Sequence, residues 1–286
     1  MIELTAVNFS LLLSFGVFIG LLGSALGVGG GIFMVPFLVL ALKLPIHQAV
    51  AASLVAIVAT SSAVAAVNVE RGLANIRLGI ALEVTTALGS IAGALIASHI
   101  PGDTVQLLFA LMLFPVSVLM FLKGRRALKK NAVPAVLPAG GAPASAFDSV
   151  FFDPAAGGHT HYRVKNMAPA SFISFFAGSL SGLLGIGGGV VQVPLMNLLC
   201  GVPMKAAAAT SNFIIGVSAA ASAYVYFRKG LIPFELTAVI VIGVLLGSFL
   251  GIYALYKARS EKLQIVFSAL TLIVAVKMLL KASEAG

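Results

Sequence analysis

Long apolar runs follow one another along nearly the whole chain, separated by short breaks that contain proline, glycine or charged residues. Division of the chain at these breaks predicts ten hydrophobic segments. Those of the first half span residues 7–26, 31–42, 46–68, 74–99 and 104–122. Those of the second half span residues 168–184, 189–200, 204–227, 232–256 and 262–281. Most reach the length of about 20 residues with which an α-helix crosses a bilayer.

The second segment of each half, 31–42 and 189–200, is too short for such a crossing. About 12 residues of α-helix rise only about 18 Å, whereas the hydrocarbon core is about 30 Å thick. We therefore expect each of these segments to be half a span. Together with the segment before it, each would form a broken helix or a re-entrant hairpin.

The two halves carry one repeated sequence unit. GVGGGIFMVP at residues 27–36 recurs as GIGGGVVQVP at residues 185–194, and the same offset of 158 continues without a gap to Gly93 and Gly251. Over this stretch, 22 of 67 positions are identical to their counterparts, which is more than a shared composition explains. The chain is therefore predicted to be a tandem repeat.

Composition identifies the solvent around these segments. Hydrophobic residues make up 60% of the chain and charged residues 9%, and the mean hydropathy is +1.09. Soluble domains average about 45–50% apolar and about 25% charged residues, so an ordinary soluble enzyme is excluded. The expected fold class is an all-α polytopic membrane protein.

The basic residues indicate how the chain is divided and oriented. The net charge is +9, and seven of the 18 Lys and Arg residues lie in a polar linker at residues 123–166: Lys123, Arg125, Arg126, Lys129, Lys130, Arg163 and Lys165. Such clustering in one connection follows the positive-inside rule, whereas a nucleic-acid-binding surface needs basic residues on one solvated face. We therefore expect a solvent-exposed cytoplasmic linker between an N-terminal repeat at 1–122 and a C-terminal repeat at 167–286.

Counting membrane crossings from this linker places both termini outside. It also places the equivalent connections at Gly72 and Gly230 on opposite sides, although Arg228 and Lys229 then oppose the charge rule. An odd number of crossings per half makes a tandem repeat inverted, as in many secondary transporters. Two inverted-topology repeats of about five segments each are therefore expected.

Two glycine runs are the predicted ligand site: Gly29, Gly30 and Gly31, and Gly187, Gly188 and Gly189. Open backbone at membrane depth is tolerated only where it is buried in protein or lines a cavity. Each run precedes a short segment, so the N-terminal N–H groups of two helices would meet as an anion site. The alternative is that these glycines only allow close helix packing, the role expected of Gly16 with Gly20, Gly89 with Gly93, and Gly247 with Gly251.

Uncharged polar side chains near the glycine runs are predicted to complete this site: Ser53, Gln192, Asn197, Thr210, Ser211 and Asn212. Ser53 and Ser211 occupy the same position of the repeat. Helix caps and interhelical hydrogen bonds are the alternative role for each of these residues. Glu83 lies well inside a predicted span, and its counterpart is Val241, so Glu83 is a candidate either for proton coupling or for a neutral structural role.

The sequence lacks the motifs of common enzyme classes. The GxGGG run does not have the third glycine of the dinucleotide fingerprint, neither HExxH nor G-x-S-x-G occurs, and no Walker lysine follows the glycines. His159 and His161, with Asp148 and Asp153 upstream, are weak evidence for a metal. We predict no catalytic residue, no metal and no cofactor.

The repeated GxGGGxxxVP is followed in each half, after eight residues, by proline and then by A-x-S or A-T-S. This pattern resembles the sulfite exporter TauE/SafE family, and the resemblance covers nearly the whole chain outside the linker. It implies an inner-membrane transporter that exports sulfite or a related sulfur-containing organic anion, with the glycine runs, Ser53 and Thr210–Asn212 around the anion. The residues by themselves indicate only a small anion.

The mechanism expected from these features is alternating access at a midplane site, either as uniport or with proton coupling through Glu83. A different class of function also fits the apolar, glycine-rich helices. In that case the chain would be a non-transporting membrane scaffold or assembly protein whose glycine motifs only pack helices.

Overall fold

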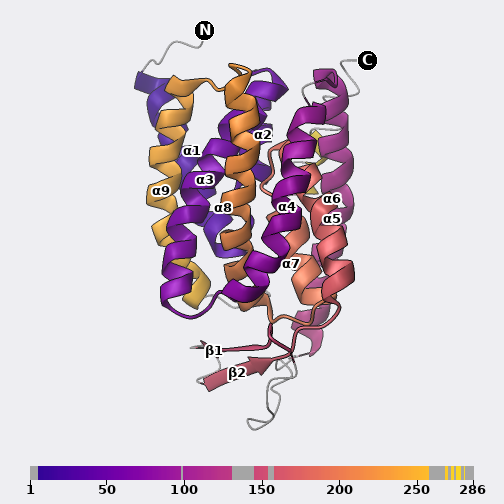
Figure 1. The fold of residues 1–286 in the computed structure, drawn as a ribbon. Helices are drawn as coiled ribbons and strands as arrows, with labels where there is room; N and C mark the ends of the chain where they lie inside the picture. Colours follow the sequence, from indigo (N-terminus) through magenta and orange to yellow (C-terminus); the bar gives the residue numbers. More distant parts are fainter. Residues whose placement is uncertain are drawn as a thin grey trace.

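The computed structural model describes residues 6–97, 99–130, 145–153, 158–257 and parts of 268–280. Most of the expected last segment, 262–281, and residues 131–144 of the linker lie outside this part of the chain. The helices are α1 (Ala6–Leu26), α2 (Gly31–Leu40), α3 (Ile46–Glu70), α4 (Ile76–Ala97), α5 (Gly102–Lys130), α6 (Met167–Leu184), α7 (Gly189–Leu198), α8 (Met204–Arg228) and α9 (Phe234–Lys257). They form an upright bundle (Figure 1).

The described helices fit a protein that crosses the membrane several times. Six of them, α1, α3, α4, α6, α8 and α9, contain a stretch long and apolar enough to span a bilayer. The two helices that follow the glycine runs, α2 and α7, have only 10 residues each, which corresponds to a rise of about 15 Å. Their shortness agrees with the expectation of half-spans.

The two halves of the chain pack into each other. Helix α1 of the first half lies along α9 of the second, α6 of the second half lies along α4 of the first, and α3 packs against α8 (Figure 1). Because the first helix of each half packs chiefly on the fourth helix of the other half, neither half has its main helix contacts within itself.

Glycines line two of these helix–helix contacts, that between α4 and α6 and that between α1 and α9, which we call the seams. A Cβ atom at Gly89 would lie 2.0 Å from the carbonyl oxygen of Phe175, and one at Gly247 would lie 1.9 Å from that of Val17. Gly93 and Gly251 approach Ser179 and Leu21 in the same way. These contacts confirm the packing role predicted for the small-residue pairs, because any larger residue would push the helices apart.

The seam contacts obey the same offset as the sequence repeat. The contact of Gly178 with Thr86 becomes the contact of Gly20 with Val244 when 158 is subtracted from one number and added to the other. Gly89 with Phe175 becomes Gly247 with Val17 by the same exchange. The repeat is therefore a property of the contacts between the halves as well as of the sequence.

Equivalent connections of the two halves lie at opposite ends of the bundle. The connection from α3 to α4 is at the lower end in Figure 1, where the strands β1 (Ser149–Asp153) and β2 (Gly158–Tyr162) also lie. The connection from α8 to α9 is at the upper end. Helices α3 and α8 therefore run in opposite directions.

The linker is more structured than its composition predicts. Helix α5 continues to Lys130, and β1 pairs with β2 in an antiparallel hairpin in which Phe151 lies opposite Thr160. Phe151, Thr160 and Tyr162 are buried. One face of the hairpin is therefore buried against the end of the helix bundle, while Val150 and Phe152 on the other face are exposed.

Candidate functional site

The two glycine runs form tight turns between a long helix and a short one. Gly27, Gly29 and Gly30 have φ values of 71°, 73° and 82°, and Gly185, Gly187 and Gly188 have φ values of 69°, 78° and 69°. This left-handed region is readily accessible only to glycine. The GxGGG motif is therefore required first of all by the backbone of the turns between α1 and α2 and between α6 and α7.

The two turns meet, as the sequence analysis expected. A Cβ atom at Gly31 would lie 2.4 Å from the carbonyl oxygen of Gly185, and one at Gly189 would lie 2.5 Å from that of Gly27. The last glycine of each run thus touches the first glycine of the other motif. The N-terminal ends of α2 and α7 are therefore brought together, each with a positive helix end.

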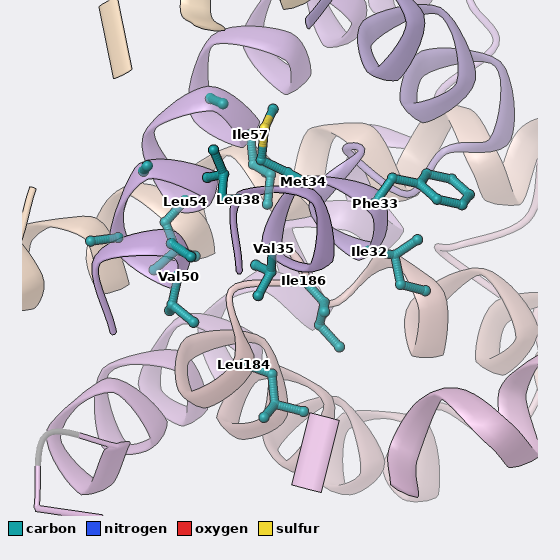
Figure 2. Close-up of a cluster of buried hydrophobic side chains, with 14 of the residues drawn as sticks. Ile32, Phe33, Met34, Val35, Leu38, Val50, Leu54, Ile57, Leu184 and Ile186 are labelled. Carbon is teal, nitrogen blue, oxygen red and sulfur yellow. The ribbon is translucent and has the colours of Figure 1, made fainter. Parts of the chain in front are cut away.

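Apolar side chains fill the space beside these turns. The Cγ2 atom of Ile57 lies 3.0 Å from a Cβ built at Gly29, and that of Ile215, the counterpart of Ile57, lies 2.9 Å from one built at Gly187. Figure 2 shows Ile57 in a buried cluster that α2, α3 and the α6–α7 turn share. In this structure the turns are packed backbone against backbone, so the packing role of the glycines is present together with the meeting of the helix ends.

Ser53 is bonded to the turn of the opposite half. Its hydroxyl donates to the carbonyl oxygen of Gly185, at 2.7 Å, in a buried contact. Its counterpart Ser211 lies on α8 between Ala208, which touches Gly27, and Ile215, and so faces the α1–α2 turn. Ser211 is buried, but its hydroxyl has no hydrogen-bond partner among the described residues.

A second repeat-related pair, Tyr226 and Asn68, shows the same difference and was not predicted from the sequence. The Tyr226 hydroxyl donates to the carbonyl oxygen of Gly182 at 3.1 Å. Both side-chain polar atoms of Asn68 are buried and without a partner in the described part of the chain. The sequence carried one signal of this pair. The offset of 158 places Asn68 and Tyr226, both polar, at the same position of the repeat, in segments that are otherwise apolar.

Asn212 is a third buried polar residue without a partner among the residues described. Neither its amide nitrogen nor its amide oxygen is hydrogen-bonded, and the side chain has no exposed surface. The counterpart of Asn212 is Leu54, which belongs to the apolar cluster of Figure 2. The two halves therefore differ in polarity at this position.

Three of the other predicted residues are engaged in bonds between elements. Gln192 donates to the Thr86 hydroxyl at 2.8 Å and accepts from that of Ser174 at 3.3 Å, which ties α7 to α4 and α6. Thr210 accepts the backbone N–H of Asn75 at 2.9 Å. Asn197 donates to the carbonyl oxygen of Val202 at 2.7 Å, within the connection from α7 to α8. The bonds of Gln192 are the interhelical kind named as the alternative role, whereas that of Asn197 lies within one connection and was not anticipated.

Glu83 lies on the face of α4 that packs against α8. One turn before it, Gly79 approaches Phe213, and two turns after it, the hydroxyl of Ser90 donates to the carbonyl oxygen of Ser218. Glu83 is buried, and neither carboxyl oxygen has a hydrogen-bond partner in the described chain. A buried carboxyl without a partner in a membrane-spanning helix is a feature of proton-coupling sites and also of neutral structural residues, so both candidate roles of Glu83 stay open.

Ser181 also lies beside a glycine turn and was not predicted. Its hydroxyl oxygen is 3.6 Å from a Cβ built at Gly188, and it has no partner among the described residues. Within the same part of the chain, no three His, Cys, Asp or Glu side chains gather as a metal site would require. His159 is instead stacked edge-on against Phe152 across the hairpin, with ring centroids 5.4 Å apart.

Comparison with known proteins gives consistent matches over nearly the whole chain. The family model described as "Sulfite exporter TauE/SafE" matches residues 12–278. A "Probable membrane transporter protein YunE" of Bacillus subtilis is 25% identical over 96% of this chain and 98% of its own length. A "Probable membrane transporter protein" of Xylella fastidiosa is 26% identical over 90% of each chain. A "Sulfite exporter TauE/SafE family protein 5" of Arabidopsis thaliana is 37% identical over 31% of this chain and 20% of its own. No solved structure matches.

Proposed function

The chain belongs to the sulfite exporter TauE/SafE family, and from this membership we propose that it is a secondary transporter that exports sulfite or a related small sulfur-containing anion. The family is one of membrane transporters and not of enzymes. The observation that carries the proposal is the meeting of the two glycine turns, where Gly31 touches Gly185 and Gly189 touches Gly27. Two helix N-termini at one place favour a negative ligand without a buried lysine or arginine.

We propose further that the two halves are inverted repeats which alternate in access to the two sides of the inner membrane. Two features support this arrangement. The contacts between the halves exchange under the offset of 158, as a pseudo-twofold axis requires. The equivalent α3–α4 and α8–α9 connections lie at opposite ends of the bundle (Figure 1). With the linker in the cytoplasm, both chain termini are outside.

Export of an anion fits the electrical driving force. The inside-negative membrane potential favours anion exit by about 2.3 kcal/mol per charge per 100 mV. Neutral donors would bind the anion without the strong attraction of a fixed positive charge, so release on the outer side stays fast. Transport as uniport is therefore sufficient for export.

The direct test is flux of radiolabelled sulfite in proteoliposomes. We expect entry or exit above that of protein-free vesicles, with a rate that depends on the imposed membrane potential. Sulfate, thiosulfate and sulfoacetate added in excess identify which anion competes best. A reconstituted, folded protein that gives no flux of any of these anions would contradict the proposal and favour a scaffold.

The inverted arrangement predicts how two single cysteines are labelled. Gly72 and Gly230 have φ values of 63° and 66° and no atom within 4 Å of a built Cβ, so a cysteine there is open to reagent. In a Cys200→Ala background, we expect membrane-impermeant maleimide to label Gly72→Cys only from the cytoplasmic side and Gly230→Cys only from the outside. Labelling of both from one side rules out the inverted topology.

Proton coupling through Glu83 predicts a change in the pH dependence of transport. A carboxyl that binds and releases a proton in each cycle makes flux depend on the pH on both sides, whereas the amide of Glu83→Gln does not titrate. We expect the variant to keep its fold and to lose the response of sulfite flux to an imposed pH gradient. An unchanged response in Glu83→Gln assigns Glu83 a structural role.

A further inference from the structure

The two glycine turns differ in the hydrogen bonds that side chains of the central helices α3 and α8 make to them. On the α6–α7 side, Ser53 donates to the carbonyl oxygen of Gly185, just beyond the end of α6. Tyr226 donates to that of Gly182, in the last turn of α6. Under the offset of 158, the corresponding donors on the α1–α2 side are Ser211 and Asn68. In the described chain neither of these makes a hydrogen bond through its side chain. The α6–α7 turn is therefore hydrogen-bonded by both of these side-chain donors, and the α1–α2 turn is bonded by neither of their counterparts.

A third polar residue enlarges this difference. Asn212 adds an unpaired amide next to Ser211, where the α6–α7 side carries the apolar Leu54. Ser211, Asn212 and Asn68 have no exposed surface. Buried polar atoms normally find partners, because an unpaired donor costs free energy. Three such side chains at related positions therefore need an explanation.

The helix directions bring these three residues to one end of the α3–α8 pair. The two helices are antiparallel (Figure 1), and they are in contact where a Cβ at Gly216 would lie 3.4 Å from that of Ser61. From this contact, Asn212 lies one turn toward the start of α8, and Asn68 lies two turns toward the end of α3. Both directions lead to the end of the bundle that carries the β-hairpin (Figure 1).

We propose that Asn68, Ser211 and Asn212 form a half-site for a small oxyanion on the side of the α1–α2 turn, facing the hairpin end. This inference rests on the proposed function and names the place where the transported anion first binds. Two primary amides and one hydroxyl offer several neutral donors, and no positive charge is needed. On the α6–α7 side the corresponding donors, Ser53 and Tyr226, are already bonded to carbonyl oxygens, so the proposed half-site lies to one side of the meeting point of the glycine turns.

The half-site makes an unusual prediction about stability. Removal of a structural hydrogen bond destabilises a protein, whereas removal of an unpaired buried polar group is neutral or stabilising. We expect Asn212→Leu, Asn68→Leu and Ser211→Ala each to leave the melting temperature of the anion-free, full-length protein unchanged or higher. In the same preparations, the affinity for sulfite should fall about 10-fold or more for each amide removed, because hydrogen bonds to charged groups are strong.

Two matched controls come from the same helices. The hydroxyls of Ser218 on α8 and Thr60 on α3 are buried and bond to carbonyl oxygens of their own helix. Ser218→Ala and Thr60→Val therefore remove a buried hydroxyl without touching the half-site, and we expect sulfite affinity within about twofold of that of the natural chain.

The measurement is sulfite binding to the detergent-purified protein, followed by thermal shift and by calorimetry. Unchanged sulfite affinity in all three half-site variants contradicts the half-site and leaves the proposed function standing. A lowered melting temperature without sulfite in all three assigns these residues a structural role and overturns the inference. A natural chain that binds none of sulfite, sulfate, thiosulfate and sulfoacetate contradicts the proposed function and the half-site together.

Discussion

Alanine at Gly31 or at Gly189 is expected to abolish sulfite transport. The added methyl group would lie 2.4 Å from the oxygen of Gly185 in the first case and 2.5 Å from that of Gly27 in the second. The Cδ1 atoms of Ile57 and Ile215 lie as close and could rotate away, but the two carbonyl oxygens belong to the backbone of an equally tight turn and cannot move aside. We expect each variant to lose about 1–3 kcal/mol or more of stability, as overpacked cores do.

Thermal unfolding and flux in proteoliposomes measure these two effects. Gly158→Ala is the matched control, because a Cβ at Gly158 meets nothing within 4 Å. Gly72→Ala separates the effect of backbone strain from that of crowding, since Gly72 has a positive φ and the same open surroundings. A Gly31→Ala protein with the melting temperature and flux of the natural chain would show that the two turns do not meet in the transport cycle.

Replacement of Asn75 by alanine is expected to detach the β-hairpin from the helix bundle. Its side-chain nitrogen donates to the carbonyl oxygen of Phe147 at 2.8 Å and to the hydroxyl of Tyr162 at 3.2 Å. Its side-chain oxygen accepts the N–H of Leu78 at 3.1 Å, in the first turn of α4. Loss of the helix cap costs about 1 kcal/mol and each lost hydrogen bond about 1 kcal/mol more.

Hydrogen exchange in residues 145–153 and 158–166 measures this detachment. We expect exchange to rise about 10-fold or more in Asn75→Ala, with a smaller change at the start of α4. Asn197→Ala is the control, because Asn197 bonds to Val202 in the connection from α7 to α8 and not to the hairpin. Equal protection of the hairpin in both variants would show that the apolar contacts of Phe151 and Tyr162 hold it without Asn75.

The pH dependence of docking follows from Tyr162. Burial raises the pKa of its hydroxyl above the ordinary value of 10.0, against smaller lowering contributions from hydrogen bonds with Asn75 and Ser149. The docked form therefore holds its proton more tightly than the detached form. The contribution of Tyr162 to docking is constant below pH 10 and falls as the pH rises above it, so we expect the exchange protection of the hairpin to decrease in that range.

The positions of the helices could be predicted because the sequence marks their ends with residues that have strong backbone preferences. Pro45 and Pro203 precede α3 and α8, and the glycine turns precede α2 and α7, so the predicted starts of these helices agree with the structure. The end of α5 was misplaced, because the Lys and Arg residues after residue 122 were interpreted as linker although they are compatible with a helix.

The hairpin was missed for a different reason. Its two strands have only five residues each, and the hairpin is held in place by contacts with distant parts of the chain, such as that between Asn75 and Tyr162. Short strands of this kind carry little local signal. Composition distinguishes this region from the apolar helices, but it says nothing about which of its side chains dock.

The candidate site was predictable only as far as backbone geometry determines it. The glycine runs could be identified because few other residues can form their turns or permit their approach. Asn68, Ser181 and Tyr226 could not, since an isolated polar residue in an apolar helix has the same appearance whether it binds a ligand or a neighbouring helix. The difference between Asn68 and Tyr226 becomes visible only when the acceptor in the other half is known.

The interlocking of the halves has a consequence for how the protein is made. The face of α1 that α9 covers remains exposed to lipid until about 230 further residues have left the ribosome and α9 has entered the membrane. Until then the face of α1 that carries Gly16 and Gly20 has no partner helix. Two halves synthesised as separate chains in one cell would be expected to associate through these same contacts of α1 with α9 and of α4 with α6.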